Sequence, residues 1–406
     1  MPQQHSVTLH RDRVRRARRA VGVVFALHGC VVGSFATRVP WLKDHLDLST
    51  GELGLALAFP AIGASVSMPL ASRLMYRHGA RAAVRGLLAL WTVSLALPLL
   101  APGMLTLCVV LTGYGAASGM SDVAMNAQGV DVEREFGKSI MSGLHGRWSV
   151  GSLLGSLGSV AAIGFGLDAR IHLALASAVL TVTGVLVCRG LLDVRPEPEA
   201  APPPRFALPP RSALLIGAVG MCAILAEGAS MDWSGVYLRD LTGSSAAVAA
   251  ASYTALACTM AVARLAGDVV VRRYGTVRTV RGSGVLAVAG GLLVVTAFTP
   301  AQGIAGFALL GIGIAVVMPL AFAAAGRSGP NPSQAIAGVA TITYTTGLIA
   351  PTLIGAVGEV ATLRASFGMI SAAACVLVCA AGVLGVRRPG GPVTADSRPA
   401  TAAADR

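Results

Sequence analysis

Residues 113–156 of this 406-residue chain read GYGAASGMSDVAMNAQGVDVEREFGKSIMSGLHGRWSVGSLLGS. The sequence is apolar and glycine-rich on both sides of a short charged turn, which predicts two helices joined by a tight connection. On the first helix, polar and small residues share one face: Gly115, Gly119, Asp122, Asn126 and Glu133. On the second, two stripes lie side by side, one of His145, Ser149, Ser152 and Ser156, the other of Gly143, Gly151 and Gly155. This pattern is typical of membrane helices that contact a neighbour through small residues and line a wet cavity with polar ones.

The composition of the whole chain also indicates a membrane protein. Hydrophobic residues make up 54% of the sequence and charged residues 13%, and the mean hydropathy is +0.70. Twelve apolar segments are each about long enough to span a bilayer, and they are 21–42, 52–73, 83–101, 104–130, 141–165, 170–189, 212–236, 246–268, 281–299, 302–325, 334–357 and 363–386. We therefore predict an all-α polytopic membrane protein with twelve transmembrane helices.

The net charge of +13 reflects the placement of arginines in short loops between these segments. Basic residues gather in the even-numbered loops and are sparse in the odd-numbered ones, as the positive-inside rule requires if both termini are cytoplasmic. They have no aromatic partners of the kind that bind nucleic acid, so we expect a lipid bilayer and no nucleic acid as partner. The seven cysteines lie inside apolar segments without metal-ligand spacing, so no metal site is expected.

Two pairs of motifs indicate an internal duplication. Leu42-Lys43-Asp44 and Leu238-Arg239-Asp240 are 196 residues apart, and so are Arg77-His78-Gly79 and Arg273-Tyr274-Gly275. Two independent anchors at one offset predict pseudo-symmetric six-helix halves. The predicted organisation is a basic cytoplasmic tail (1–20), an N-terminal half (21–189), a proline-rich cytoplasmic linker (190–211), a C-terminal half (212–387) and a disordered cytoplasmic tail (388–406).

With these features, the chain resembles the major facilitator superfamily over about residues 20–388. Its arginine-rich turns are similar to that superfamily's signature, in the first half at Arg77, Gly79 and Arg81, and in the second at Arg264, Asp268, Arg273 and Gly275. Tyr76 stands where the first-half signature has an acidic residue. The resemblance implies that these residues form a cytoplasmic gate.

Finer motifs resemble the branch that contains the membrane protein MosC and relatives of fucose permeases. They are Arg38-Val39-Pro40, Asp122-Val123-Ala124-Met125-Asn126, Leu144-His145-Gly146, Glu227-Gly228-Ala229 and Asp232-Trp233-Ser234. The resemblance implies alternating-access transport of a small polar solute, sugar-like or cyclitol-like, in the bacterial inner membrane. We also expect a monomer that needs no cofactor and draws on the proton gradient.

Carboxylates inside the membrane are the first candidates for a functional site, because each costs roughly 2.5 to 3.5 kcal/mol to insert. We interpret Asp122 and Glu227 as candidate proton carriers. Asn126, His145 and Trp148 are candidates for solute contact or proton relay. Each of the five also has a structural interpretation, as a hydrogen bond or a packing contact between helices.

The depths of Arg38 and Asp232 along their helices are similar, which predicts an outer gate. Arg38 is expected to pair with Asp232 or Glu227 across the two halves, with Trp233 beside the pair. The alternatives are that Arg38 extends to the outer surface and that Trp233 is an interfacial anchor.

Two other functions remain open at this point. A cavity lined mainly by apolar residues would favour efflux of drugs or metabolites, and a membrane sensor without transport would make the intramembrane charges expendable. An enzyme is not expected, since the sequence contains no histidine-rich metal motif, nucleophile elbow or phosphate-cradling loop.

Overall fold

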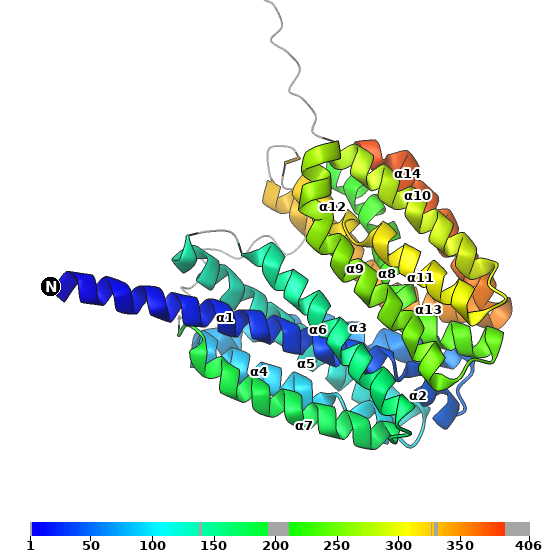
Figure 1. Ribbon diagram of the computed structural model, residues 1–406, viewed down its shortest axis with the longest axis horizontal. Helices are drawn as coiled ribbons and strands as arrows, with labels where there is room; N and C mark the ends of the chain where they lie inside the picture. The colour runs from blue at the N-terminus through cyan, green and yellow to red at the C-terminus, as the bar shows by residue number, and fades with distance from the viewer. Residues whose placement is uncertain (1, 138–139, 194–210, 326, 329–331, 386–406) are drawn as a thin grey trace, which may run out of the picture.

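A computed structural model describes residues 2–137, 140–193, 211–325, 327–328 and 332–385, which are almost entirely helical (Figure 1). The N-terminal half consists of α1 (Pro2–Ala36), α2 (Val39–His45), α3 (Thr50–His78), α4 (Ala80–Ser94), α5 (Met104–Phe136), α6 (Met141–Gly164) and α7 (Ala169–Val187). The C-terminal half consists of α8 (Arg211–Thr242), α9 (Ala246–Tyr274), α10 (Thr276–Val295), α11 (Pro300–Ile314), α12 (Val317–Ala325), α13 (Pro332–Val360) and α14 (Leu363–Ala380).

The helices follow the predicted spans, with two of the spans interrupted. The first span is formed by α1 and α2, and the tenth by α11 and α12, and short 3₁₀ turns extend α4, α7 and α14. In the described residues, 11 helical stretches are long and apolar enough to cross a membrane. The remaining predicted span, the glycine- and serine-rich α6, is not among these 11 apolar stretches. The basic segment at 2–20 is helical and continuous with the first span, whereas most of the predicted linker and all of 388–406 lie outside the described residues.

The internal duplication is visible in matching helices. Helices α3 and α9 each contain 29 residues, and each begins after a serine whose side chain caps it, Ser49 in one half and Ser245 in the other. Each ends at a glycine with positive φ, 81° at Gly79 and 79° at Gly275, a conformation that residues with a side chain rarely adopt. All of these positions are related by the predicted offset, which confirms two pseudo-symmetric halves.

The two halves converge near α2 and diverge toward the ends that carry the start of α1 and α12 (Figure 1). We call the convergent end, formed by residues 39–50 and 239–246, the clasp end. The opposite end, which carries Arg11–Arg19 and the α3–α4 and α9–α10 turns, is called the arginine end. Across the halves, α3 packs mainly on α13 and α6 on α9.

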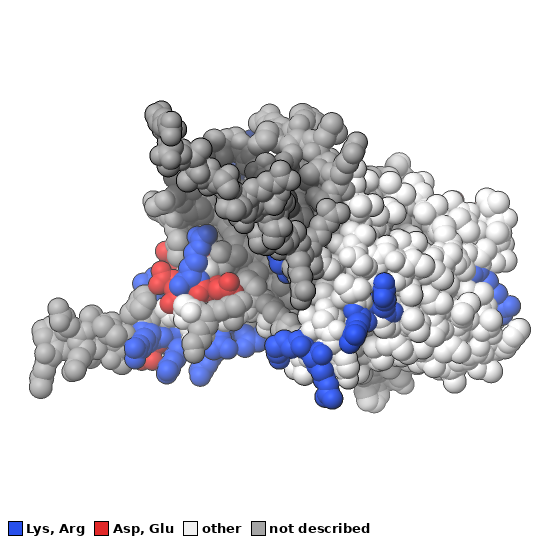
Figure 2. Space-filling view, turned by 90° about the horizontal axis from the view of Figure 1, so that it is seen from above, with Lys and Arg blue, Asp and Glu red and all other residues white. Residues whose placement is uncertain are grey.

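Charge is distributed unevenly over the surface. Figure 2 shows lysine and arginine gathered over the first part of α1, while much of the remaining described surface in this view is uncharged. Large apolar side chains, such as Val66, Leu105 and Val179, are exposed on the outside of the bundle. Such a surface is suited to lipid chains and unsuited to water.

The glycine stripe predicted on α6 is a helix contact. A Cβ on Gly151 would lie 1.9 Å from the carbonyl oxygen of Ala26, and one on Gly155 would lie 2.2 Å from that of Cys30, both on α1. The backbones of α1 and α6 therefore touch, as small residues allow in membrane bundles. Gly143 was predicted in the same stripe but does not contribute, because a Cβ there would meet nothing within 4 Å.

This contact predicts different effects for two alanine substitutions on α6. Gly151→Ala forces α1 and α6 apart and is expected to destabilise the protein by about 1–3 kcal/mol. Gly158→Ala is the matched control, because a Cβ there meets nothing within 4 Å and the helix gains up to ~1 kcal/mol in propensity. Thermal unfolding of the purified variants measures both effects, and equal shifts in melting temperature would contradict the close α1–α6 contact.

Candidate functional site

An intramembrane ion pair lies where α8, α9 and α6 meet. The carboxylate of Glu227 on α8 accepts a hydrogen bond from Nη2 of Arg264 on α9 at 2.8 Å, and the two side chains are only 13% and 19% exposed. Nη1 of Arg264 donates to the hydroxyl of Ser149 on α6 at 3.3 Å. Ser149 belongs to the other half, so this arginine joins the two halves at the carboxylate.

The third guanidinium nitrogen of Arg264 binds a backbone carbonyl at the break between α11 and α12. Its Nε donates to the carbonyl oxygen of Ala315 at 3.3 Å. In a regular helix that carbonyl would accept from the residue four positions later, but this is Pro319, which has no N–H. Pro319 thus leaves an acceptor free inside the bundle, and Arg264 occupies it.

Arg264 lies farther from the α9–α10 turn than the other residues predicted with it at the cytoplasmic gate. Helix α9 continues for ten residues beyond it, to Tyr274, which is about 15 Å at 1.5 Å per residue. The arginine is therefore central, and the signature spacing in the second half does not place it at the end of the bundle.

A second hydrogen bond joins the halves next to the ion pair. The hydroxyls of Ser152 on α6 and Tyr253 on α9 are 2.6 Å apart. Together with Arg264 they surround a small cavity of about 10 Å³ lined by Trp148, Ser149, Ser152, Met231, Tyr253, Leu256, Ala257, Met260 and Arg264. That volume is about that of one water molecule, so the side chains around it are closely packed. The predicted polar stripe on α6 does face this cavity, through Ser149 and Ser152.

Trp148 is held in place by a buried histidine that the sequence interpretation missed. Its indole Nε1 donates to Nδ1 of His28 at 3.1 Å, and Nε2 of His28 lies 3.5 Å from the carbonyl oxygen of Ser118. The ring of His28 also packs on Trp91, with 5.1 Å between ring centroids. The signal for His28 was its position inside the apolar run VVFALHGC of α1, since ionisable groups in spans are rare.

Asp122 and Asn126 lie together on α5, as their spacing predicts. The Nδ2 of Asn126 donates to the Asp122 carbonyl oxygen at 2.8 Å and to its carboxylate at 3.2 Å. Among the described residues, Asp122 pairs with no cation.

His145 lies near the start of α6 and is exposed. Its ring and that of Phe25 make an edge contact, with 5.4 Å between the ring centroids. His145 is not among the residues that line the central cavity.

The predicted pairing of Arg38 with Asp232 or Glu227 is wrong for this conformation. Nε of Arg38 donates to Nδ1 of His172 on α7 at 3.3 Å, within its own half, and the arginine is 4% exposed. The chain turns at Arg38, between α1 and α2, which directs the side chain inward and also contradicts the surface alternative. Among described residues Asp232 has no ion pair.

Buried polar atoms of Arg38 and of α8 have no hydrogen-bond partner among the described residues. They are Nη2 of Arg38, Oγ of Ser230, Nε1 of Trp233 and Oγ of Ser234. Trp233 is fully buried, which contradicts its alternative role as an interfacial anchor.

The two halves are joined at the clasp end by reciprocal ion pairs, which we call the clasp. Nζ of Lys43 lies 2.5 Å from Asp240, and Nε of Arg239 lies 2.6 Å from Asp44. The basic residues are equivalent in the duplication, and so are the acidic ones. The pseudo-two-fold axis between the halves explains why the ion pairs are reciprocal. A contact from the first half to the second implies an equivalent contact from the second half to the first.

Backbone contacts close the same end. The N–H of Gly51 donates to the carboxylate of Glu359 on α13 at 2.9 Å. A Cβ on Gly54 would lie 2.8 Å from both Gly355 Cα and the carbonyl oxygen of Pro351, so α3 and α13 touch there.

At the arginine end, the predicted gate residues make contacts within their own halves. Nε of Arg81 donates to the carbonyl oxygen of Leu191 at 3.0 Å, and Arg77 is exposed. The guanidinium of Arg273 lies 5.6 Å from the ring of its neighbour Tyr274. The side chain of Asp268 lies outside the described part of the structure.

This architecture matches a known protein family, since residues 21–347 fit the sequence model of the Major Facilitator Superfamily. The chain belongs to that superfamily. Among curated proteins, it is 35% identical over 369 residues to the uncharacterized transporter y4wD of Sinorhizobium fredii, covering 90% of this chain and 97% of the relative. It is 30% identical over 376 residues to the membrane protein MosC of Rhizobium meliloti, covering 92% and 91%.

Solved structures show the same superfamily fold at low sequence identity. The nucleoside transporter NupG superposes with a TM-score of 0.69 at 14% identity, covering 91% of this chain and 98% of NupG. A bacterial homologue of the human lysosomal transporter Spinster, inward-facing and occupied, gives 0.71 at 11% identity over 90% and 95%. The protein is thus a multi-pass membrane transporter of this superfamily.

The clasp predicts a charge-reversal effect in this transporter. Asp240→Lys places two ammonium groups together, which is expected to favour molecules whose clasp end is open. Because an exposed pair contributes about 0.2–1 kcal/mol, the ratio of open to closed molecules should rise a few-fold. Spin labels at Phe165 and Ala361, exposed positions on the two halves at this end, measure the distance. The double reversal Lys43→Asp/Asp240→Lys should restore the closed distance. Equal distances in all three proteins would mean that the pairs contribute nothing to closure.

Proposed function

We propose that this chain is a proton-coupled secondary transporter that moves a small polar solute, such as a sugar or cyclitol derivative, across the bacterial inner membrane by alternating access. The observation that carries this proposal is the set of contacts made by Arg264. One cation is bound at once to an ionisable carboxylate, Glu227, and to a hydroxyl of the opposite half, Ser149. Proton binding at the carboxylate is thereby linked to contact between the halves.

The ion pair is the contact that a proton would change. Protonation of Glu227 would remove the negative partner of Arg264, and the same guanidinium also donates to Ser149 of the other half. The proposed proton site and a contact between the halves therefore share one side chain.

The cavity lining suits a hydroxyl-rich solute. Ser149, Ser152 and Tyr253 offer hydroxyl groups, and Trp148 offers an aromatic face. Sugars present hydroxyls around an apolar ring face, so both kinds of group have a partner in such a solute. The fold shared with a nucleoside transporter, whose substrate contains a sugar, agrees with this choice.

Export of a more apolar metabolite or drug is the second candidate. Met231, Leu256, Ala257 and Met260 line the same cavity, and methionine adapts to ligands of varied shape. The two candidates differ in the chemistry of the transported solute, so a panel of polar and apolar solutes distinguishes them.

We further propose that the arginine end faces the cytoplasm, that both termini lie there, and that the transporter works as a monomer. The arginines of the α3–α4 and α9–α10 turns support this orientation through the positive-inside rule. The clasp then lies on the outer side, and a closed clasp with halves that diverge at the other end corresponds to an inward-facing arrangement, as in the Spinster homologue.

Orientation is tested by labelling single cysteines in intact cells. A cysteine at Ala246, exposed at the clasp end, should react with a membrane-impermeant maleimide, whereas one at Arg77 should react only after permeabilisation. Native cysteines are blocked beforehand or replaced. The reverse pattern would contradict the proposed topology.

Coupling is tested in proteoliposomes that contain a trapped pH dye. A panel of sugars, cyclitols, amino-sugars and cationic drugs is added, and solute-driven proton movement is recorded. Glu227→Gln should lower the proton flux by roughly tenfold or more, equivalent to 1.4 kcal/mol in the barrier. Glu52→Gln is the matched control, because Glu52 caps α3 at the clasp end and glutamine also serves in a capping box.

The outcomes separate the candidates. Flux driven by polyols supports the proposed solute class, and flux driven only by cationic drugs supports efflux. Normal flux in Glu227→Gln with loss in Asp122→Asn would move the coupling site to α5. Absence of flux with every solute would contradict the proposal and favour the sensor.

A further inference from the structure

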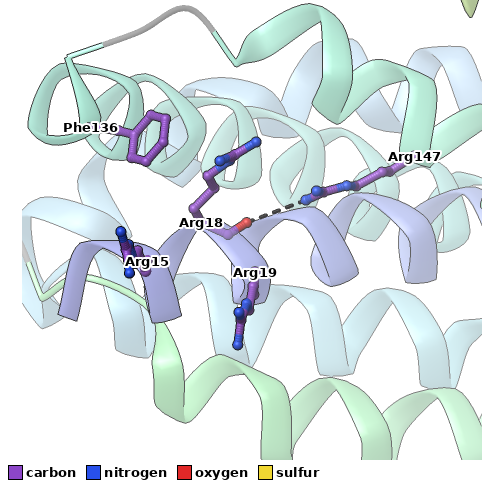
Figure 3. Close-up of a pocket in the computed structure, with 5 residues that line it drawn as sticks. All are labelled: Arg15, Arg18, Arg19, Phe136 and Arg147. Atoms are coloured by element: carbon purple, nitrogen blue, oxygen red, sulfur yellow. Dashed lines mark hydrogen bonds between the residues drawn. The ribbon is translucent and has the colours of Figure 1, made fainter. Parts of the chain in front are cut away.

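A second cavity in the described residues lies away from the central site, at the arginine end. It has a volume of about 460 Å³ and is lined by Arg15, Arg18, Arg19, Phe136 and Arg147 (Figure 3). Four of its five lining residues are arginines, contributed by α1 and α6, and the fifth is the last residue of α5. None of them takes part in the contacts proposed for transport.

The cavity has a defined geometry. On α1, the three arginines are spaced so that they project from neighbouring positions of the helix. The guanidinium of Arg18 stands 4.6 Å from the ring centroid of Phe136, a cation–π contact. Nη1 of Arg147 reaches over from α6 and donates to the carbonyl oxygen of Arg18 at 3.4 Å (Figure 3).

Gly22 makes the approach of Arg147 possible. A Cβ at residue 22 would lie 1.6 Å from Nη1 of Arg147, so the guanidinium crosses α1 where a side chain is missing. The exposed side chain of Arg147 thus lies across α1 at this glycine.

Among the described residues, the lining of the cavity contains no carboxylate, and none of its four arginines forms an ion pair. Each guanidinium has five N–H donors, and a single one of these twenty, on Arg147, has an acceptor among the described contacts. Like charges gathered on neighbouring turns destabilise a helix unless an anion joins them.

We propose that this cavity binds a phosphate-bearing anion. Guanidinium groups match phosphate oxygens in pairs of parallel hydrogen bonds, and several arginines with free donors are the usual means of holding that group. Two sources share this chemistry: the headgroup of an anionic phospholipid at the membrane surface, and a free phosphate in solution. Basic pockets between spanning helices are known positions for lipid headgroups. The bound anion would connect the start of α1 to α6.

The test uses the full-length protein in a neutral detergent. Short-chain phosphatidylglycerol, phosphatidylcholine and inorganic phosphate are titrated separately, and the dissociation constant and the shift in melting temperature are measured for each. The wild type should bind phosphatidylglycerol or phosphate, and not phosphatidylcholine. Arg15→Gln/Arg18→Gln should weaken binding by roughly tenfold or more, the factor that corresponds to 1.4 kcal/mol.

Two further variants separate a built site from general attraction between opposite charges. Arg11→Gln/Arg13→Gln removes the same charge from the same helix outside the cavity and should bind as the wild type does. Gly22→Ala keeps every arginine but displaces Arg147, and it should weaken binding at unchanged net charge. If Arg15→Gln/Arg18→Gln fails to fold, the affinity of Gly22→Ala tests the proposal in its place.

Each outcome decides the proposal. Binding of phosphatidylglycerol without inorganic phosphate assigns the lipid headgroup, and binding of both, in competition, assigns the phosphate group itself. Equal affinity for phosphatidylcholine, no binding of either anion, or an equal loss in Arg11→Gln/Arg13→Gln would overturn it. None of these measurements involves transport, so the result is independent of the proposed function.

Discussion

A charged side chain inside a bilayer must find partners, and the arrangement around Arg264 follows from that constraint. Its three nitrogens each have an acceptor: a carboxylate on α8, a hydroxyl on α6 and the carbonyl of Ala315. The last of these exists because Pro319 interrupts the helix. Satisfying one buried cation thus requires a helix break in one half and a serine from the other.

The remaining contacts across the bundle differ between the two sides of this centre. Within the N-terminal half, α1 and α6 touch backbone to backbone at glycines, so the two helices are closely packed. Between the halves, α6 meets α9 through the hydrogen bonds of Ser149 and Ser152. Hydrogen bonds exchange partners with little cost when water or a solute replaces them, whereas close backbone packing does not. Helix α6 therefore combines close backbone packing on α1 of its own half with hydrogen bonds to α9 of the other half, whereas α3 and α13 meet across the halves by backbone packing at the clasp end.

Much of the fold was predictable because membrane helices leave a strong sequence signal. Span lengths, the duplication at one offset and the small-residue face of α6 depend on local patterns, and the structure contains them. The contacts of Arg264 and Arg38 were not predictable from those patterns. The depth of a residue on its own helix does not tell which neighbour it faces, and a turn at residues 37 and 38 directs Arg38 to His172 within its own half. His28 was missed because the apolar run around it was interpreted as a span and not searched for polar groups.

The clasp shows why weak interactions suit a contact that must break. Lys43–Asp240 and Asp44–Arg239 are partly exposed, with side chains 15% to 42% accessible, so each contributes far less than a buried pair. Symmetry supplies two of them, and the close approach of Gly54 to Gly355 adds packing that needs no side chain. Closure of this end is then the sum of several small contributions. A single strong pair at this end, such as the predicted one between Arg38 and Glu227, would have held the two halves in one orientation.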